Sequence, residues 1–147
     1  MKPTSISPAR ILLVDDSKDG LLVRKTLLEE LGYTVHVANN GEEGLKLFES
    51  NSFNVVVTDY RMPRMNGVEL IQRIRVIDPH ARIVLVSKIA EPLGLTEENT
   101  GADAVISKSS SEAANLQRWV KRLVNRGIPR KPPTSQKKRA LARATAR

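Results

Sequence analysis

Short apolar segments alternate with longer segments of helical spacing between residues 10 and 125. The apolar segments are rich in β-branched residues, which is typical of strands. They are Ile11–Val14, Thr34–Ala38, Phe53–Thr58, Ile83–Val86 and Ala104–Ile106. The first and third contain almost no polar residue, as strands do when both faces of a sheet are covered. The pattern therefore predicts five strands, with the first and third near the centre of the sheet.

The segments between these strands have the spacing of amphipathic helices. Val23, Leu27 and Leu31 recur every four residues, with Leu28 beside them, and Gly32 ends this helix. The last helix has the clearest pattern, with apolar residues at i, i+3, i+4, i+7 and i+8. These residues are Leu116, Trp119, Val120, Leu123 and Val124.

Other residues predict where helices begin, end or weaken. Ser109 to Ser111 offer N-terminal caps for the last helix, and Gly127 and Pro129 follow it. The helix between the fourth and fifth strands is the weakest. Pro92, Gly94 and Gly101 leave space there for little more than two turns.

Alternating strands and helices indicate β–α–β units, and hence an α/β domain with a parallel sheet and helices on both faces. No repeat is visible, so we predict one domain over residues 9–125, after an N-terminal extension at 1–8 and before a tail at 126–147. Ligands of such sheets bind beyond the carboxyl ends of the strands. A strand order of 2-1-3-4-5 would make strands one and three neighbours at the point where the order reverses.

Polar residues follow four of the predicted strands. Asp15 and Asp16 follow the first, Asp59 the third, Ser87 the fourth and Lys108 the fifth. Because the carboxyl ends of parallel strands meet at one edge, we expect these side chains in one pocket. Three carboxylates repel one another unless a cation joins them, and hard oxygen ligands with space for water suit Mg²⁺. Asp59 would then be the nucleophile of a covalent aspartyl-phosphate, with Lys108 balancing charge and Ser87 donating a hydrogen bond.

Four segments resemble the receiver domains of response regulators in two-component signalling. They are ILLVDDS, VVVTDYRMPRMNG, IVLVS and AVISK, in this order and spacing. The resemblance covers about residues 9 to 125 and implies a flavodoxin-like, five-stranded parallel sheet of order 2-1-3-4-5. Its most specific part is the loop from Asp59 to Pro63, followed by Asn66 and Gly67.

The resemblance also implies a reaction. Asp59 would accept a phosphoryl group from a sensor histidine kinase or a phosphotransfer protein. Asp16 and Asp59 would bind Mg²⁺ directly, with the backbone carbonyl of Arg61, while Asp15 would help through water. Ser87 would be the switch hydroxyl and Lys108 the phosphate-binding lysine. The domain would signal by protein–protein contacts and have no external product, so we do not expect an enzyme.

Three positions depart from the pattern of receivers. Val105 stands where an aromatic residue usually precedes the lysine, Ser109 replaces the usual proline after it, and Lys88 replaces a small residue after Ser87. The surface of the fourth helix, fifth strand and fifth helix is where receivers commonly dimerise or dock partners. A homodimer or an unidentified output protein at this surface is therefore expected, but through unusual residues.

Simpler interpretations exist for each site residue. Asp16 could cap the first helix, and Asp59 could be an ordinary turn residue. Ser87 could be a common strand-end serine and Lys108 a solvated lysine. Their joint position at the ends of neighbouring strands favours a site instead.

The charge lies in the tail and not in the domain. The formal net charge is +8, yet residues 1–125 contain equal numbers of basic and acidic residues. From Arg126 to Arg147 there are basic residues and no acidic ones. We expect this tail to be disordered when free. It would attach by charge either to an acidic partner or to nucleic-acid phosphates, in the latter case without reading sequence.

Composition also excludes several classes of protein. The chain has no cysteine, which excludes disulfides and thiolate metal sites. The longest apolar run near the N-terminus is too short for a signal peptide or a membrane span, so a cytoplasmic protein with no membrane contact is expected.

Three rival functions remain open. The first is a pseudo-receiver that binds partners without phosphorylation, and the second is a nucleic-acid-binding regulator that acts through its tail. The third is an acid-based phosphatase on a similar sheet. Such enzymes usually place a second aspartate two residues after the nucleophile, where this chain has Arg61.

Overall fold

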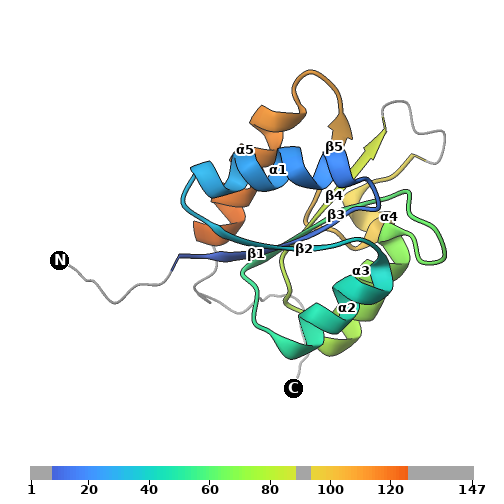
Figure 1. Cartoon of the computed structure of the whole chain (residues 1–147). Helices are drawn as coiled ribbons and strands as arrows, with labels where there is room; N and C mark the ends of the chain where they lie inside the picture. The colour runs from blue at the N-terminus through green and yellow to red at the C-terminus, as the bar shows by residue number, and fades with distance from the viewer. Residues whose placement is uncertain (1–7, 89–93, 126–147) are drawn as a thin grey trace.

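The computed structural model describes residues 8–88 and 94–125, and in this part five parallel strands form one sheet. The sheet order is β2-β1-β3-β4-β5, as predicted (Figure 1). The strands are β1 (Arg10–Val14), β2 (Thr34–Ala38), β3 (Val55–Asp59), β4 (Ile83–Lys88) and β5 (Ala104–Lys108). The helices are α1 (Lys18–Glu30), α2 (Gly41–Ser50), α3 (Gly67–Ile77), α4 (Glu97–Thr100) and α5 (Glu112–Asn125).

Helices cover both faces of this sheet. Helices α1 and α5 lie on one face, and α2, α3 and α4 lie on the other (Figure 1). The central strands supply both cores because successive side chains point to opposite faces. In β1, Ile11 and Leu13 face α1 and α5, whereas Leu12 and Val14 face the other layer. All four are fully buried, which explains the continuous apolar run in the sequence.

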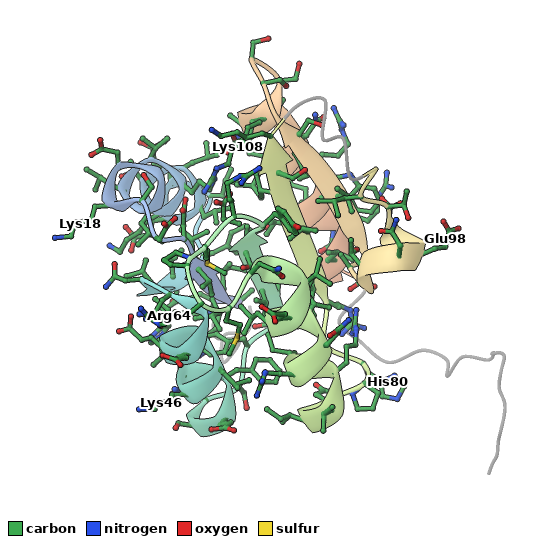
Figure 2. All side chains as sticks on the ribbon, turned by 90° about the vertical axis from the view of Figure 1, so that its right-hand side faces the viewer. Lys18, Lys46, Arg64, His80, Glu98 and Lys108 are labelled. Carbon is green, nitrogen blue, oxygen red and sulfur yellow. The ribbon has the colours of Figure 1, made fainter. Side chains whose placement is uncertain are left out.

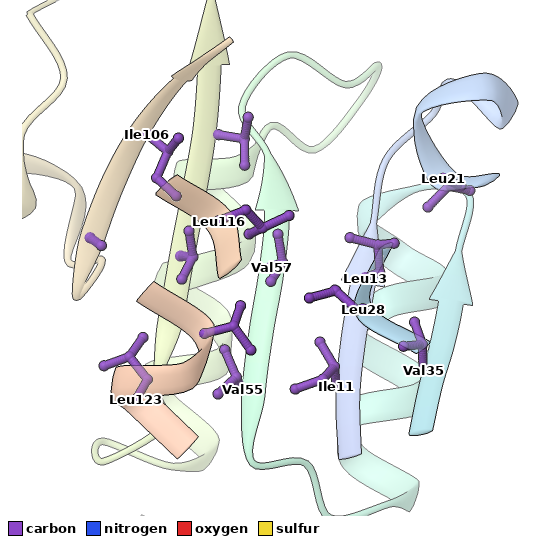
Figure 3. Close-up of a cluster of buried hydrophobic side chains, with 14 residues drawn as sticks. Ile11, Leu13, Leu21, Leu28, Val35, Val55, Val57, Ile106, Leu116 and Leu123 are labelled. Atoms are coloured by element: carbon purple, nitrogen blue, oxygen red, sulfur yellow. The ribbon is translucent and has the colours of Figure 1, made fainter. Parts of the chain in front are cut away.

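The core under α1 and α5 holds these two helices against the sheet. Leu28 of α1 and Leu116 and Leu123 of α5 are fully buried against residues of β1 and β3 such as Ile11 and Val57 (Figure 3). Burying each such side chain contributes about 2 kcal/mol. The packing therefore sets where the first residues of α1 and α5 stand relative to the sheet.

Helix α1 buries Leu28 and packs Leu27 against the core, as its apolar spacing suggested, but the rest of its buried face differs from the prediction. Its buried residues are Leu21, Arg24 and Leu28. Val23 is 66% exposed and Leu31 is 39% exposed. The helix has more apolar residues than one face can hold. The face that packs on the sheet includes an arginine because that side chain finds carboxylate partners at the end of the sheet, as described below.

Three strands extend one or two residues further at their carboxyl ends than predicted, whereas β1 and β2 end where predicted. Asp59, Ser87 and Lys108 belong to β3, β4 and β5 and do not merely follow them. Helix α4 is a single turn, which Thr96 caps at its start and Gly101, at a φ of 85°, ends. Residues 1–7, Pro92 and the predicted tail at 126–147, including Gly127 and Pro129, lie outside the described residues. No helix in the described part of the chain is both long and apolar enough to span a membrane.

Candidate functional site at the carboxyl end of the sheet

The ends of three strands open into one cleft. Asp15 follows β1, Asp59 ends β3 and Lys108 ends β5. Figure 2 shows Lys108 at one end of the sheet, with Lys46 and His80 near the opposite end. The cleft has a volume of about 390 Å³. It is lined by Asp15, Asp16, Ser17, Asp59, Arg61, Met62, Pro63, Lys88 and Lys108. Every site residue predicted from the sequence except Ser87 therefore lines it.

Three carboxylates gather in this cleft. Asp15, Asp16 and Asp59 each place one oxygen within 4.8 Å of the others. Asp15 and Asp59 are buried, whereas Asp16 is open to solvent. Mg²⁺ binds hard oxygen ligands, takes few carboxylates and keeps several waters, so it needs both close carboxylates and an open side. This donor set fits Mg²⁺.

The Asp59 carboxylate pairs with Lys108. Nζ of Lys108 lies 2.7 Å from Oδ1 of Asp59. Burial raises the pKa of Asp59, the nearby Lys108 ammonium lowers it and the Asp15 charge raises it, with a net upward shift from its ordinary value. The Lys108 side chain is 28% exposed, so its ammonium has space to follow an incoming anion. The pair places a nucleophilic oxygen beside a cation that would balance a phosphoryl group.

The loop after β3 holds the Asp59 backbone in place. The Gly67 amide donates to the Tyr60 carbonyl at 2.8 Å, which closes the loop. A Cβ at residue 67 would lie 2.4 Å from the Asp59 carbonyl oxygen, so glycine is required there. Asn66 then caps α3 through a capping box. Arg61 stands exposed in the cleft wall between these fixed points.

Asp15 is held by two donors from α1 and its entry turn. The Ser17 amide donates to Oδ1 of Asp15 at 3.0 Å, and Nη1 of Arg24 donates to Oδ2 at 2.6 Å. Nε of Arg24 donates to Oε2 of Glu112, at the start of α5, at 2.7 Å. Burial lowers the pKa of Arg24, but Glu112 and Asp15 outweigh it and the net shift is upward. Arg24 is therefore a permanent cation between two carboxylates.

Sequence reasoning missed Arg24 and Glu112. A signal for Arg24 was present, because it shares the i, i+3, i+7 spacing of Leu21 and Leu28 and is the one charged member of that set. A charged residue in a buried stripe requires a partner of opposite charge. No comparable signal pointed to Glu112, because the spatial neighbours of a residue 88 positions away depend on the fold.

The cap of α1 decides between two interpretations of Asp16. Ser17 is the N-cap, and its side chain accepts a hydrogen bond from the Gly20 amide at 3.1 Å. Asp16 therefore does not cap the helix. Its carboxylate stays among the three oxygens of the cluster.

The structure places the predicted switch hydroxyl, Ser87, in β4, and Val105 in β5. Ser87 is buried at the carboxyl end of β4 and does not line the cleft, whereas its neighbour Lys88 does. Side chains on successive strand residues point to opposite sides, which explains why one of the two faces the opening. Val105 is half-buried in β5, and its amide donates to Oε2 of Glu97 at 3.2 Å.

Known proteins are similar to this chain in both sequence and fold. Residues 11–120 match the response regulator receiver domain family. The gliding motility regulatory protein of Myxococcus xanthus is 32% identical over 132 residues, which is 83% of this chain and 17% of that protein. A CheY-like receiver domain protein from Methanospirillum hungatei superposes with a TM-score of 0.75 at 32% identity, over 82% of this chain and 97% of that one. The response regulator TrrA of Thermotoga maritima, solved with Mg²⁺ and BeF, gives 0.71 at 34% identity, over 78% and 98%.

The doubly wound sheet and its acidic cleft define a receiver-type domain. The chain belongs to the response regulator receiver domain family of two-component systems. Domains of this family are generally signalling modules and relate to histidine kinases and phosphotransfer proteins. The chain spans less than a fifth of the length of the Myxococcus protein.

Proposed function

We propose that this chain is a phosphoacceptor that takes a phosphoryl group onto Asp59 from a histidine kinase or a phosphotransfer protein. One observation carries the proposal. The buried Asp59 carboxylate lies 2.7 Å from a lysine ammonium and within 4.8 Å of oxygens from two further aspartates. Such a group combines a nucleophile, a counter-charge and a cation site within one cleft.

In the reaction, an Asp59 oxygen attacks phosphorus as the bond from phosphorus to the donor's histidine nitrogen breaks, and that nitrogen keeps the electron pair. Asp16, Asp59 and the Arg61 backbone carbonyl would hold Mg²⁺, with Asp15 acting through water. When bound, the metal supplies charge neutralisation for the phosphoryl oxygens. Lys108 would move from Asp59 to the new phosphate. The Ser87 hydroxyl would donate to a phosphoryl oxygen.

The test is intact-mass spectrometry of the full chain after incubation with acetyl phosphate. We expect one added phosphate on the native chain with Mg²⁺, none without Mg²⁺ and none on Asp59→Asn. Asp19→Asn is the matched control, since it removes an exposed carboxylate from the first turn of α1 and should leave the adduct unchanged. A native chain that forms neither a phosphate adduct nor a stable complex with beryllofluoride would contradict the proposal and favour a pseudo-receiver.

We further propose that the phosphorylated domain signals by protein contacts at α4, β5 and α5 and has no external product. The unusual residue on this surface is Val105, whose amide is occupied by Glu97 of α4. That hydrogen bond connects the short α4 to β5, so a shift of α4 would change the position of the β5 backbone at Val105. Homodimerisation here, and nucleic-acid binding through the basic residues after Asn125, stay predictions. Sedimentation velocity of the full chain with and without beryllofluoride tests the homodimer, and a chain that stays monomeric in both conditions would contradict dimerisation at this surface.

A further inference from the structure

A buried arginine joins the acidic cleft to α5. Arg24 is 5% exposed, and its guanidinium reaches both Asp15, at 2.6 Å, and Glu112, at 2.7 Å. Removing a guanidinium from water is costly unless carboxylates replace the lost hydration. Two carboxylates from different elements do so here, and one of them belongs to the acidic cluster.

The space for this contact depends on a glycine in α1. A Cβ at Gly20 would lie 2.5 Å from Oδ2 of Asp15 and 3.5 Å from Nη1 of Arg24. Glycine in a helix costs about 1 kcal/mol relative to alanine. Gly20 is therefore less favourable for the helix itself, but it leaves space for Asp15 and Arg24 to approach each other. The Ser17 amide takes the other oxygen of Asp15. Protein donors therefore occupy both oxygens of that carboxylate.

We propose that Arg24 is a positioning residue that competes with Mg²⁺ for Asp15, and that Glu112 relieves this competition and so couples α5 to metal binding. The proposal rests on the function proposed above, because it concerns Mg²⁺ in the same cleft. It adds a residue outside the cleft lining that tunes the metal site.

Charge determines the direction of each effect. Arg24 already neutralises part of the cluster, so a divalent cation gains less attraction when the guanidinium is present. Glu112 neutralises Arg24 from the other side. Removing Arg24 should therefore tighten metal binding, whereas neutralising Glu112 should leave more of the guanidinium charge on Asp15 and weaken it.

Isothermal titration of the full chain with Mg²⁺ tests these opposite signs. We expect Arg24→Met to bind Mg²⁺ about threefold to tenfold more tightly, and Glu112→Gln about threefold more weakly. Arg24→Lys, which keeps the charge, should return the affinity to within about threefold of native. Lys25→Met removes a neighbouring, half-exposed cation paired with Glu29, and should change the affinity by less than about twofold.

The outcomes separate this inference from the proposed function. A purely structural Arg24 would make both Arg24→Met and Glu112→Gln bind more weakly, and that result would overturn the inference, as would equal affinities in folded variants. A native chain that binds no Mg²⁺ would overturn the metal site of the proposed function as well. If Arg24→Met fails to fold by circular dichroism, Arg24→Gln replaces it: tighter Mg²⁺ binding by that variant is expected, and weaker or equal binding would overturn the inference.

Discussion

Two ion pairs stand at the carboxyl end of the sheet, and they differ in how their cations are held. Lys108 lies 2.7 Å from Asp59 with 28% of its side chain exposed, and this is its one ion pair within the described residues. Arg24 lies 2.6 Å from Asp15 with 7% of its side chain exposed, and is also fixed by Glu112. The distances are nearly equal, so distance alone does not distinguish them. The difference in exposure supports the proposal that Lys108 meets the phosphoryl group and the inference that Arg24 positions and tunes the site.

The largest expected effect compares the two cations in phosphorylation. Lys108→Met should slow adduct formation with acetyl phosphate by about 10²-fold or more, which is the usual effect of removing one donor to a developing charge. Arg24→Met, assayed at saturating Mg²⁺, should change the rate by less than about tenfold. Lys88→Met, which removes an exposed cation from the same cleft wall, is the control. Equal losses for Lys108→Met and Lys88→Met would show that the cleft needs positive charge but no particular lysine.

The order of the two cations should reverse in stability. Arg24→Met leaves Asp15 and Glu112 without their partner and should lower the free energy of unfolding by about 3 kcal/mol. This corresponds to a fall of roughly 10 °C in Tm for a chain of this size. Lys108→Met should cost about 1 kcal/mol or less, because that pair is partly solvated. Thermal unfolding in EDTA measures both, and a smaller loss for Arg24→Met than for Lys108→Met would contradict the distinction.

The two ion pairs also differ in whether the sequence alone could predict them. The five strands and the cluster of Asp15, Asp16, Asp59 and Lys108 were predictable, because a parallel sheet places the polar ends of its strands at one edge. The strand order followed from the resemblance to receiver domains. The Asp59–Lys108 pair follows from that placement. The link from Arg24 to Glu112 was not predictable, since it depends on how α1 rotates on the sheet and where α5 begins. The apolar spacing of Val23, Leu27 and Leu31 suggested another rotation.

A smaller effect is expected at the contact that lets Arg24 approach. Gly20→Ala should lower the free energy of unfolding by about 1 kcal/mol, although alanine normally stabilises a helix by about that amount. The added Cβ would lie 2.5 Å from Oδ2 of Asp15, which Arg24 holds in place. Thr26→Ala, at an exposed position of the same helix, should be neutral or stabilising, because it introduces the helix propensity of alanine without a contact to Asp15. Gly20→Ala at least as stable as the native chain would show that Asp15 is free to move.

The smallest expected effect concerns the pH dependence of Asp59. Its pKa in the folded chain is raised, chiefly by burial, so the folded state binds this proton more readily than the unfolded state. Stability is therefore lost as the pH rises from the ordinary carboxyl value through the raised one. Asp59→Asn should remove that loss and raise Tm by about 3 °C near neutral pH, with a smaller difference near pH 4. Melting curves in EDTA between these pH values would show it.

The control for this last prediction is Asp19→Asn, an exposed aspartate in the first turn of α1, whose Tm difference from the native chain should vary little with pH. A pH-independent difference for Asp59→Asn would mean that Lys108 fully offsets burial. The loss of stability in Arg24→Met compared with Lys108→Met would then be the remaining energetic distinction between the two ion pairs. A difference that grows with pH would instead show that Asp59 is held in a destabilising charged state. Mg²⁺ would relieve such a carboxylate, because the cation balances its charge.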